Sequence, residues 1–202
     1  MTTNYYLLIS GDMIVGPGSQ PAMQTQTTTD PETGQTTTID VPLPLPANCI
    51  PCTQTQAETW QTLEFVGGVL QAIPAAMLLS QAQAAQKVLL RASCVSAIVS
   101  GFVSSALGSA YTYPSTLTDQ HNLSGSVVAS LLPNLPSTWT TPFWVMDSTS
   151  AWSFAPHTAA QIQQAGLDGK AWITTCQQKK TSLDAQIDAA TTVSAVQSVV
   201  WL

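Results

Sequence analysis

Charged side chains are scarce in this chain of 202 residues. Five are basic and eleven are acidic, so charged residues make up 8% of the chain, whereas a typical soluble domain has about 25%. A formal net charge of −6 with so few basic residues argues against nucleic acid and anionic membranes, because both are bound through clustered Lys and Arg. An uncharged polar surface also loses little hydration when another protein covers it. The composition therefore favours assembly with other proteins and with further copies of the chain.

Long apolar runs are also missing. The N-terminus has no basic segment, and its apolar run is too short for a signal peptide. The most apolar stretch, residues 65–79, is interrupted by Gln71 and Pro74, whereas a membrane-spanning helix needs about twenty apolar residues. We therefore expect no membrane span, and we interpret residues 65–79 as a buried helix or as the helical core of an oligomer.

Motifs for metal, redox or nucleotide chemistry are incomplete. Cys49 and Cys52 have the Cys-x-x-Cys spacing, but neither a second such pair nor a close His pair completes a metal site. We expect free thiols there, with a local disulfide or a metal or redox site as alternatives. His121 and His157 lie near expected helix starts, which favours structural or solvent-facing roles. Because nucleophile-elbow and phosphate-loop motifs are missing as well, we predict that the chain is not an enzyme and binds no cofactor or metal.

The N-terminal 53 residues contain only strand and turn signals. Residues 5–9 and 13–15 flank Gly11-Asp12, a pattern typical of a β-hairpin. Gly16-Pro17-Gly18 is expected to end its second strand.

A Thr- and Gln-rich segment and a Pro-rich segment follow this hairpin. Residues 24–39 surround an Asp-Pro-Glu-Thr-Gly turn, which predicts either a polar hairpin or a flexible arm. Residues 41–46 alternate apolar residues with proline, which favours an extended strap that lacks backbone donors at the prolines. We interpret residues 1–53 as a β-rich N-terminal arm that docks onto neighbouring proteins.

Residues 54–100 have a helical pattern. Apolar residues from Trp60 to Met77 recur at spacings of three and four, which predicts a helix that Pro74 kinks or divides. The same spacing continues over residues 80–99, and Gly101 is a reasonable stop.

Residues 101–202 alternate short strands with helices. Hairpins are expected at 102–113 and 143–154, with Trp144 and Trp152 as core anchors on the second. Thr118, Thr158 and Thr192 are expected to cap helices that begin at 119, 159 and 193 and end near 131, 190 and 201. The long middle helix has a heptad seam, which predicts packing on its own domain or in a bundle between subunits. The seam residues are Ile162, Gly166, Gly169, Ile173, Cys176, Lys180, Leu183, Ile187 and Ala190.

From about residue 82 the chain resembles DUF4376, a domain of unknown function that occurs in tail-fibre and baseplate-region proteins of tailed bacteriophages. The resemblance is carried by Gly-Phe-Val-Ser-Ser-Ala-Leu-Gly at 101–108, Tyr-Thr-Tyr-Pro-Ser at 111–115, Asp-Gln-His-Asn-Leu at 119–123, Trp144, Trp152, His-Thr-Ala-Ala-Gln-Ile at 157–162, Ala-Ala-Thr-Thr at 189–192 and Trp201. It implies a place in a phage tail, and it supplies no catalytic residues.

The sequence thus predicts an α+β protein: an N-terminal β or extended arm, followed by a mostly helical domain with two short β-hairpins. We expect a structural protein of the phage tail, associated with a fibre or the baseplate, present in the virion and in the host cytoplasm during assembly. A tail-fibre assembly chaperone is the alternative, and a glycan-degrading tail enzyme is a weaker one. The expected partners are other tail, baseplate or fibre proteins. The expected docking residues are Tyr5, Tyr6, Leu8, Val41, Leu43, Leu45, Trp60, Leu63 and Leu70.

Overall fold

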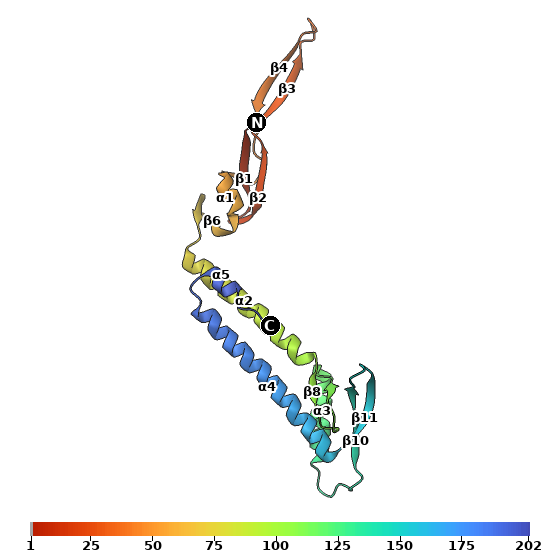
Figure 1. The fold of residues 1–202 in the computed structure, drawn as a ribbon. Helices are drawn as coiled ribbons and strands as arrows, with labels where there is room; N and C mark the ends of the chain where they lie inside the picture. The colour runs from red at the N-terminus through yellow and green to blue at the C-terminus, as the bar shows by residue number, and fades with distance from the viewer. Residues whose placement is uncertain (1) are drawn as a thin grey trace. The chain divides into compact units, whose positions relative to one another are not determined.

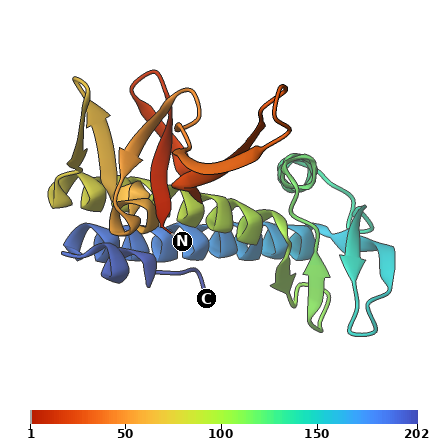
Figure 2. The same ribbon diagram turned by 90° about the horizontal axis from the view of Figure 1, so that it is seen from above.

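The computed structural model describes residues 2–202, and the chain divides into two compact units, Met1–Leu78 and Leu79–Leu202. Both units are drawn in Figure 1, and Figure 2 shows them from above. The first unit consists mainly of strands, and the second combines long helices with a four-stranded sheet. The expected α+β class is therefore confirmed.

The first unit is built on a three-stranded antiparallel sheet in the order β2-β1-β5. Its strands are β1 (Thr3–Ser10), β2 (Met13–Pro21) and β5 (Cys49–Cys52). The expected first hairpin is confirmed, with Gly11 in the left-handed region at its turn (φ 62°). Gly18 does not end β2, however, because it pairs with Tyr6 in the ladder. A Cβ on Gly18 would lie 2.3 Å from the Tyr6 ring, so glycine at this position leaves room for the ring and does not reverse the chain.

The cysteines of the Cys-x-x-Cys motif belong to β5 and are both free thiols, as expected. Because they are three residues apart on a strand, their side chains point to opposite faces. Partial burial raises the pKa of the Cys52 thiol.

The Thr-rich segment forms a two-stranded antiparallel ribbon of β3 (Met23–Thr29) and β4 (Thr36–Pro42). Of the two alternatives for this segment, the structure contains the hairpin. Cross-strand side chains are paired: Thr25 donates to Asp40 at 2.9 Å, and Thr27 lies 3.4 Å from Thr38. Asp30 closes the turn by accepting from two backbone N–H groups, which lowers its pKa. None of the ribbon's residues is fully buried, so cross-strand hydrogen bonds stabilise it in place of a core.

The helix expected through residues 60–73 is wrong. The chain forms a short helix α1 (Gln54–Glu58), a 3-10 turn η1 (Trp60–Thr62), and a hairpin of β6 (Leu63–Val66) and β7 (Val69–Ala72). Gly67 and Gly68 have φ of 58° and 84° and form the turn, a conformation that would interrupt a helix. Pro74 does not kink a helix, because it immediately precedes the helix α2 (Ala75–Val99). The interpretation of residues 65–79 as one buried helix or helical oligomer core is therefore also wrong.

The second unit is organised along α4 (Ala159–Ala189), a helix of 31 residues. The expected cap at Thr158 is confirmed, and it forms a capping box with Gln161. Part of the predicted seam is fully covered, namely Ile162, Gly169, Cys176 and Ile187. The seam packs within its own unit, as the first alternative expected.

The C-terminal half of α4 lies beside α2 (Figures 1 and 2). Ile187 forms a small core there with Leu90 of α2 and Val196 of the short helix α5 (Val193–Gln197). Gln83 on α2 donates to the carbonyl of Ile187 at 3.1 Å. Thr192 caps α5 as expected, but α5 ends at Gln197 and does not continue to residue 201.

The N-terminal half of α4 covers a sheet in the order β11-β10-β9-β8. Both expected hairpins are present, formed by β8 (Phe102–Ser104) with β9 (Tyr111–Tyr113) and by β10 (Thr140–Met146) with β11 (Trp152–Thr158). Helix α3 (Leu117–Ser130) completes this part. The core consists of Phe102, Tyr113, Leu123, Phe143, Val145, Ile162 and Ala165.

Two expectations for this part are corrected. Thr116, not Thr118, caps α3: its hydroxyl accepts from the Asp119 N–H, while the Asp119 carboxylate accepts from the Thr116 N–H at 3.0 Å. Trp144 and Trp152 are not core anchors, because they are 50% and 49% exposed. Since side chains alternate along a strand, the inward-facing Phe143 and Val145 place Trp144 on the outer face.

His157 has the structural role that its position suggested. It is fully buried, its Nε2 lies 2.8 Å from the Tyr113 hydroxyl, and its Nδ1 lies 2.9 Å from the Ala155 carbonyl. A carbonyl can only accept, so Nδ1 donates and Nε2 of the neutral ring accepts from Tyr113. Burial lowers the pKa of His157. Burial, with smaller contributions from Asp168 and Tyr111, raises the pKa of Tyr113 to about 12.

We expect His157→Gln to lower the free energy of unfolding by about 1–3 kcal/mol at pH 7.5, because it leaves a buried polar group poorly paired. In the folded state the pKa of His157 lies below its ordinary value of 6.5. Below pH 6.5 the unfolded state therefore binds a proton more readily than the folded state, so the stability of the wild type falls as the pH drops. The stability difference between wild type and variant should therefore shrink towards pH 5.5 in urea titrations. His121→Gln, at an exposed histidine, is the control, and an unchanged difference between the two pH values would contradict this account.

Candidate functional site

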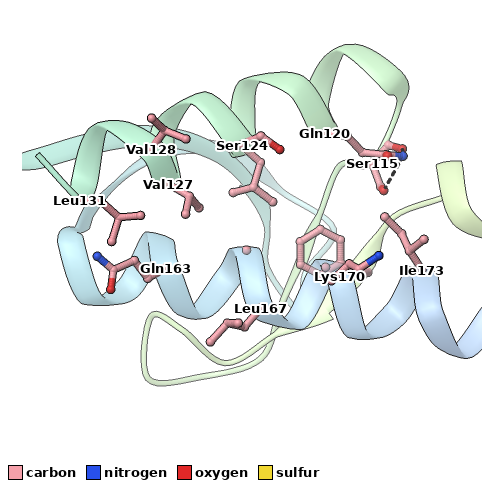
Figure 3. Close-up of a pocket in the computed structure, with 14 residues that line it drawn as sticks. Ser115, Gln120, Ser124, Val127, Val128, Leu131, Gln163, Leu167, Lys170 and Ile173 are labelled. Atoms are coloured by element: carbon pink, nitrogen blue, oxygen red, sulfur yellow. Dashed lines mark hydrogen bonds between the residues drawn. The ribbon is translucent and has the colours of Figure 1, made fainter.

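The second unit has a groove between α3 and α4 with a volume of about 570 Å³ (Figure 3). This size lies within the range of natural binding pockets. Its walls are mainly apolar, with a few polar groups. The lining residues are Phe102, Ser115, Gln120, Leu123, Ser124, Val127, Val128, Leu131, Gln163, Gly166, Leu167, Gly169, Lys170 and Ile173.

The two helices run antiparallel along the groove. At one end, Gln163 on α4 donates from Nε2 to the Ser130 hydroxyl at 3.0 Å. At the other end, Gln120 on α3 donates to the Ser115 carbonyl at 2.9 Å, on the side where Lys170 lies in Figure 3. The first bond joins the C-terminal end of α3 to α4, whereas the second is local to the N-terminal end of α3.

Glycine residues on α4 bring the neighbouring elements close. A Cβ on Gly166 would lie 2.7 Å from Cγ2 of Val127, and one on Gly169 would lie 2.9 Å from the Phe102 ring. Both distances are shorter than van der Waals contact, so a larger side chain would force these elements away from α4. The groove floor therefore depends on glycine at both positions.

The rims of the groove are apolar and open to solvent. Val128 and Leu131 on α3 are 64% and 66% exposed, and Leu167 on α4 is 66% exposed. Exposed Leu and Val side chains that converge on a concave apolar surface indicate an interaction site, whereas single exposed residues do not.

Lys170 is the one charged residue among those that line the groove. Within residues 2–202 its ammonium group has no carboxylate partner, whereas Lys87 pairs with Asp188 and Lys180 pairs with Asp184. Lys179 instead lies over the Trp201 ring. The groove thus combines an apolar surface with a single uncompensated positive charge.

The docking residues expected from the sequence all belong to the first unit. Tyr5, Tyr6 and Leu8 lie on β1, Val41 on β4, Trp60 in η1, Leu63 on β6 and Leu70 on β7, while Leu43 and Leu45 lie between β4 and β5. Leu8 is exposed and the other eight are half-buried. Tyr5 and Trp60 line one shallow depression, and Tyr5 and Leu45 line another.

The groove belongs to the second unit, and the sequence reasoning missed it. A signal was present: Ser124, Val128 and Leu131 recur at heptad-like spacing on the helix expected from residue 119, and Leu117 continues the pattern just before it. The pattern was hidden because Ser and Gln interrupt the apolar positions. Among the described residues 2–202, no three His, Cys, Asp or Glu side chains are grouped closely enough to hold a metal ion. In the same range, none of the helices has the length and apolar content needed to cross a bilayer.

A double-mutant cycle tests the close approach of α3 and α4. We expect Gly166→Ala to destabilise the protein, because its methyl would clash with Val127, and the clash should exceed the gain of about 1 kcal/mol in helix propensity. Val127→Ala removes the clashing methyls, so the double variant should be more stable than the sum of the single effects by about 1 kcal/mol. Additive losses in urea unfolding would show that the two positions do not touch.

Comparison with known proteins identifies the region that contains the groove. Residues 81–200, more than half of the chain, match the family described as a domain of unknown function, DUF4376. No curated protein and no solved structure matches the chain at a significant level. The chain therefore belongs to the DUF4376 family.

Proposed function

We propose that this chain is a non-catalytic structural component of a bacteriophage tail, associated with a fibre or the baseplate, that docks through its N-terminal unit. The observation that carries the proposal is how little that unit buries by itself. Leu7 and Ala57 are the fully covered apolar residues among residues 2–78, and the β3–β4 ribbon has none. A domain with so small a core is marginal alone, and a partner that covers it would stabilise it.

The composition and the family resemblance support the same proposal. With charged residues at 8%, most of the surface can be covered by a neighbouring protein without stripping water from unpaired charges. The DUF4376-like blocks of the C-terminal unit resemble those of phage tail-fibre and baseplate-region proteins. In this account the polar ribbon and the Pro-rich segment after it supply an arm, and the virion is where the protein resides.

A tail-fibre assembly chaperone is the second candidate. The open groove of the second unit favours it, because a chaperone must leave an apolar surface available for a client protein. The two candidates differ in whether the protein stays with the finished particle.

We expect mass spectrometry of purified virions of the encoding phage to detect the protein at a fixed ratio to the tail proteins. Release of the protein from virions only when the tails are disrupted would indicate that it is part of the tail. Its presence in infected cells but absence from mature particles would contradict the structural role and favour the chaperone.

We also propose that copies of the chain associate. Light scattering of the purified protein should then give a mass of at least twice the 21.3 kDa of one chain. A stable species at the mass of one chain, over micromolar concentrations, would count against a homo-oligomer.

A further inference from the structure

We propose that the groove between α3 and α4 binds a helix of a partner protein, one that is apolar along one face and places an acidic side chain beside Lys170. The inference rests on the geometry and charge of the second unit. It does not require that the protein be part of a phage tail.

The spacing of the groove residues indicates that the occupant is a helix. Along α3 the residues of the open side follow one another in steps of three and four, and so do those along α4. The lining residues of this side are Gln120, Ser124, Val128 and Leu131 along α3 and Gln163, Leu167 and Lys170 along α4. Leu117 continues the α3 stripe at the next helical step beyond the lining residues. Two antiparallel helices with such stripes form a groove into which the ridge of a third helix fits.

The length of the apolar stripe argues against a small molecule. Leu117 at one end of α3 is 70% exposed and Leu131 at the other is 66% exposed. At 1.5 Å per residue they lie about 21 Å apart along the helix. A small ligand would fill the central hollow and leave these ends in water, whereas a helix of three to four turns would cover both.

Charge defines the chemistry of that helix. No acidic residue lines the groove, and Lys170 is the only charge that a docked helix would meet there. A basic residue at that position would lose hydration and be repelled, while a carboxylate would compensate Lys170 in a surrounding of low polarity. The expected partner helix is therefore neutral and apolar except for Asp or Glu at one seam position.

Helix α2 of a second copy fits the groove poorly. Its exposed side carries a stripe formed by Val88, Ala92, Val95 and Val99. Arg91 lines the same stripe, so a docked α2 would bring one positive charge towards another.

The test uses the purified full chain and two designed helical peptides of about 21 residues, each with Leu and Ala along one seam. One carries Glu at the seam position that faces Lys170 near one end of the groove, and the matched peptide carries Lys there. By fluorescence anisotropy the Glu peptide should bind about three- to tenfold more tightly than the Lys peptide. Lys170→Glu should reverse this preference, which a loss of fold would not do.

Substitutions on the rim separate the groove from the rest of the surface. Leu167→Glu and Val128→Glu should each weaken binding of the Glu peptide by roughly tenfold or more. Val88→Glu is the matched control, because Val88 is as exposed as Leu167, at 66%, but lies on α2 outside the groove. It should leave peptide binding unchanged, and circular dichroism should show the same helix content for all variants.

Three results would overturn the proposal. The first is equal binding of the two peptides. The second is binding that Leu167→Glu leaves intact. The third is self-association of the free protein that Leu167→Glu abolishes and Val88→Glu does not, since a second copy would then fill the groove. None of these results depends on where the protein resides, so failure here and absence from virions remain separate findings.

Discussion

The buried face of α4 is the constraint on which residues 79–202 depend. At its N-terminal end, Ile162 and Ala165 pack against the sheet and α3 as part of the main core. Near its C-terminal end, Ile187 packs with Leu90 and Val196 in a second, smaller core. One helix thus joins two clusters, whose members on α4, Ala165 and Ile187, lie about six turns apart along the helix. Because helical residues three and four apart share a face, a single seam can serve both.

Small residues on that seam determine how close the neighbours come. Gly166 and Gly169 allow Val127 and Phe102 to approach α4 at distances that any side chain would forbid. The close approach fixes α3 along one side of α4 but leaves their outward sides uncovered. The groove therefore results from the same packing that stabilises the unit. Because charged residues are scarce in the chain, Lys170 is the one charged residue among those that line the groove.

Elements with strong local signals were predictable from the sequence. The first hairpin has its Gly turn, and α4 has its Thr158 cap and heptad seam. Residues 60–73 were not predictable in the same way, because apolar residues in two four-residue strands imitate helical spacing. There the paired glycines at 67 and 68 decide the outcome.

Features that depend on the tertiary fold were harder to predict. Which side of β10 faces the core is decided by α4, so sequence alone did not show that Trp144 faces outward. The groove was missed for a similar reason. Its two walls come from separate helices, and the heptad seam that contains Gly166 and Gly169 does not indicate which elements pack against these glycines.

Native-state hydrogen exchange on the full chain tests the central role of α4 most directly. If the seam organises the second unit, the slowest amides should be those of α4 between Ile162 and Cys176, and α3 and the sheet should exchange at or above that rate. Protected α3 and sheet amides alongside rapid exchange in this part of α4 would contradict the account.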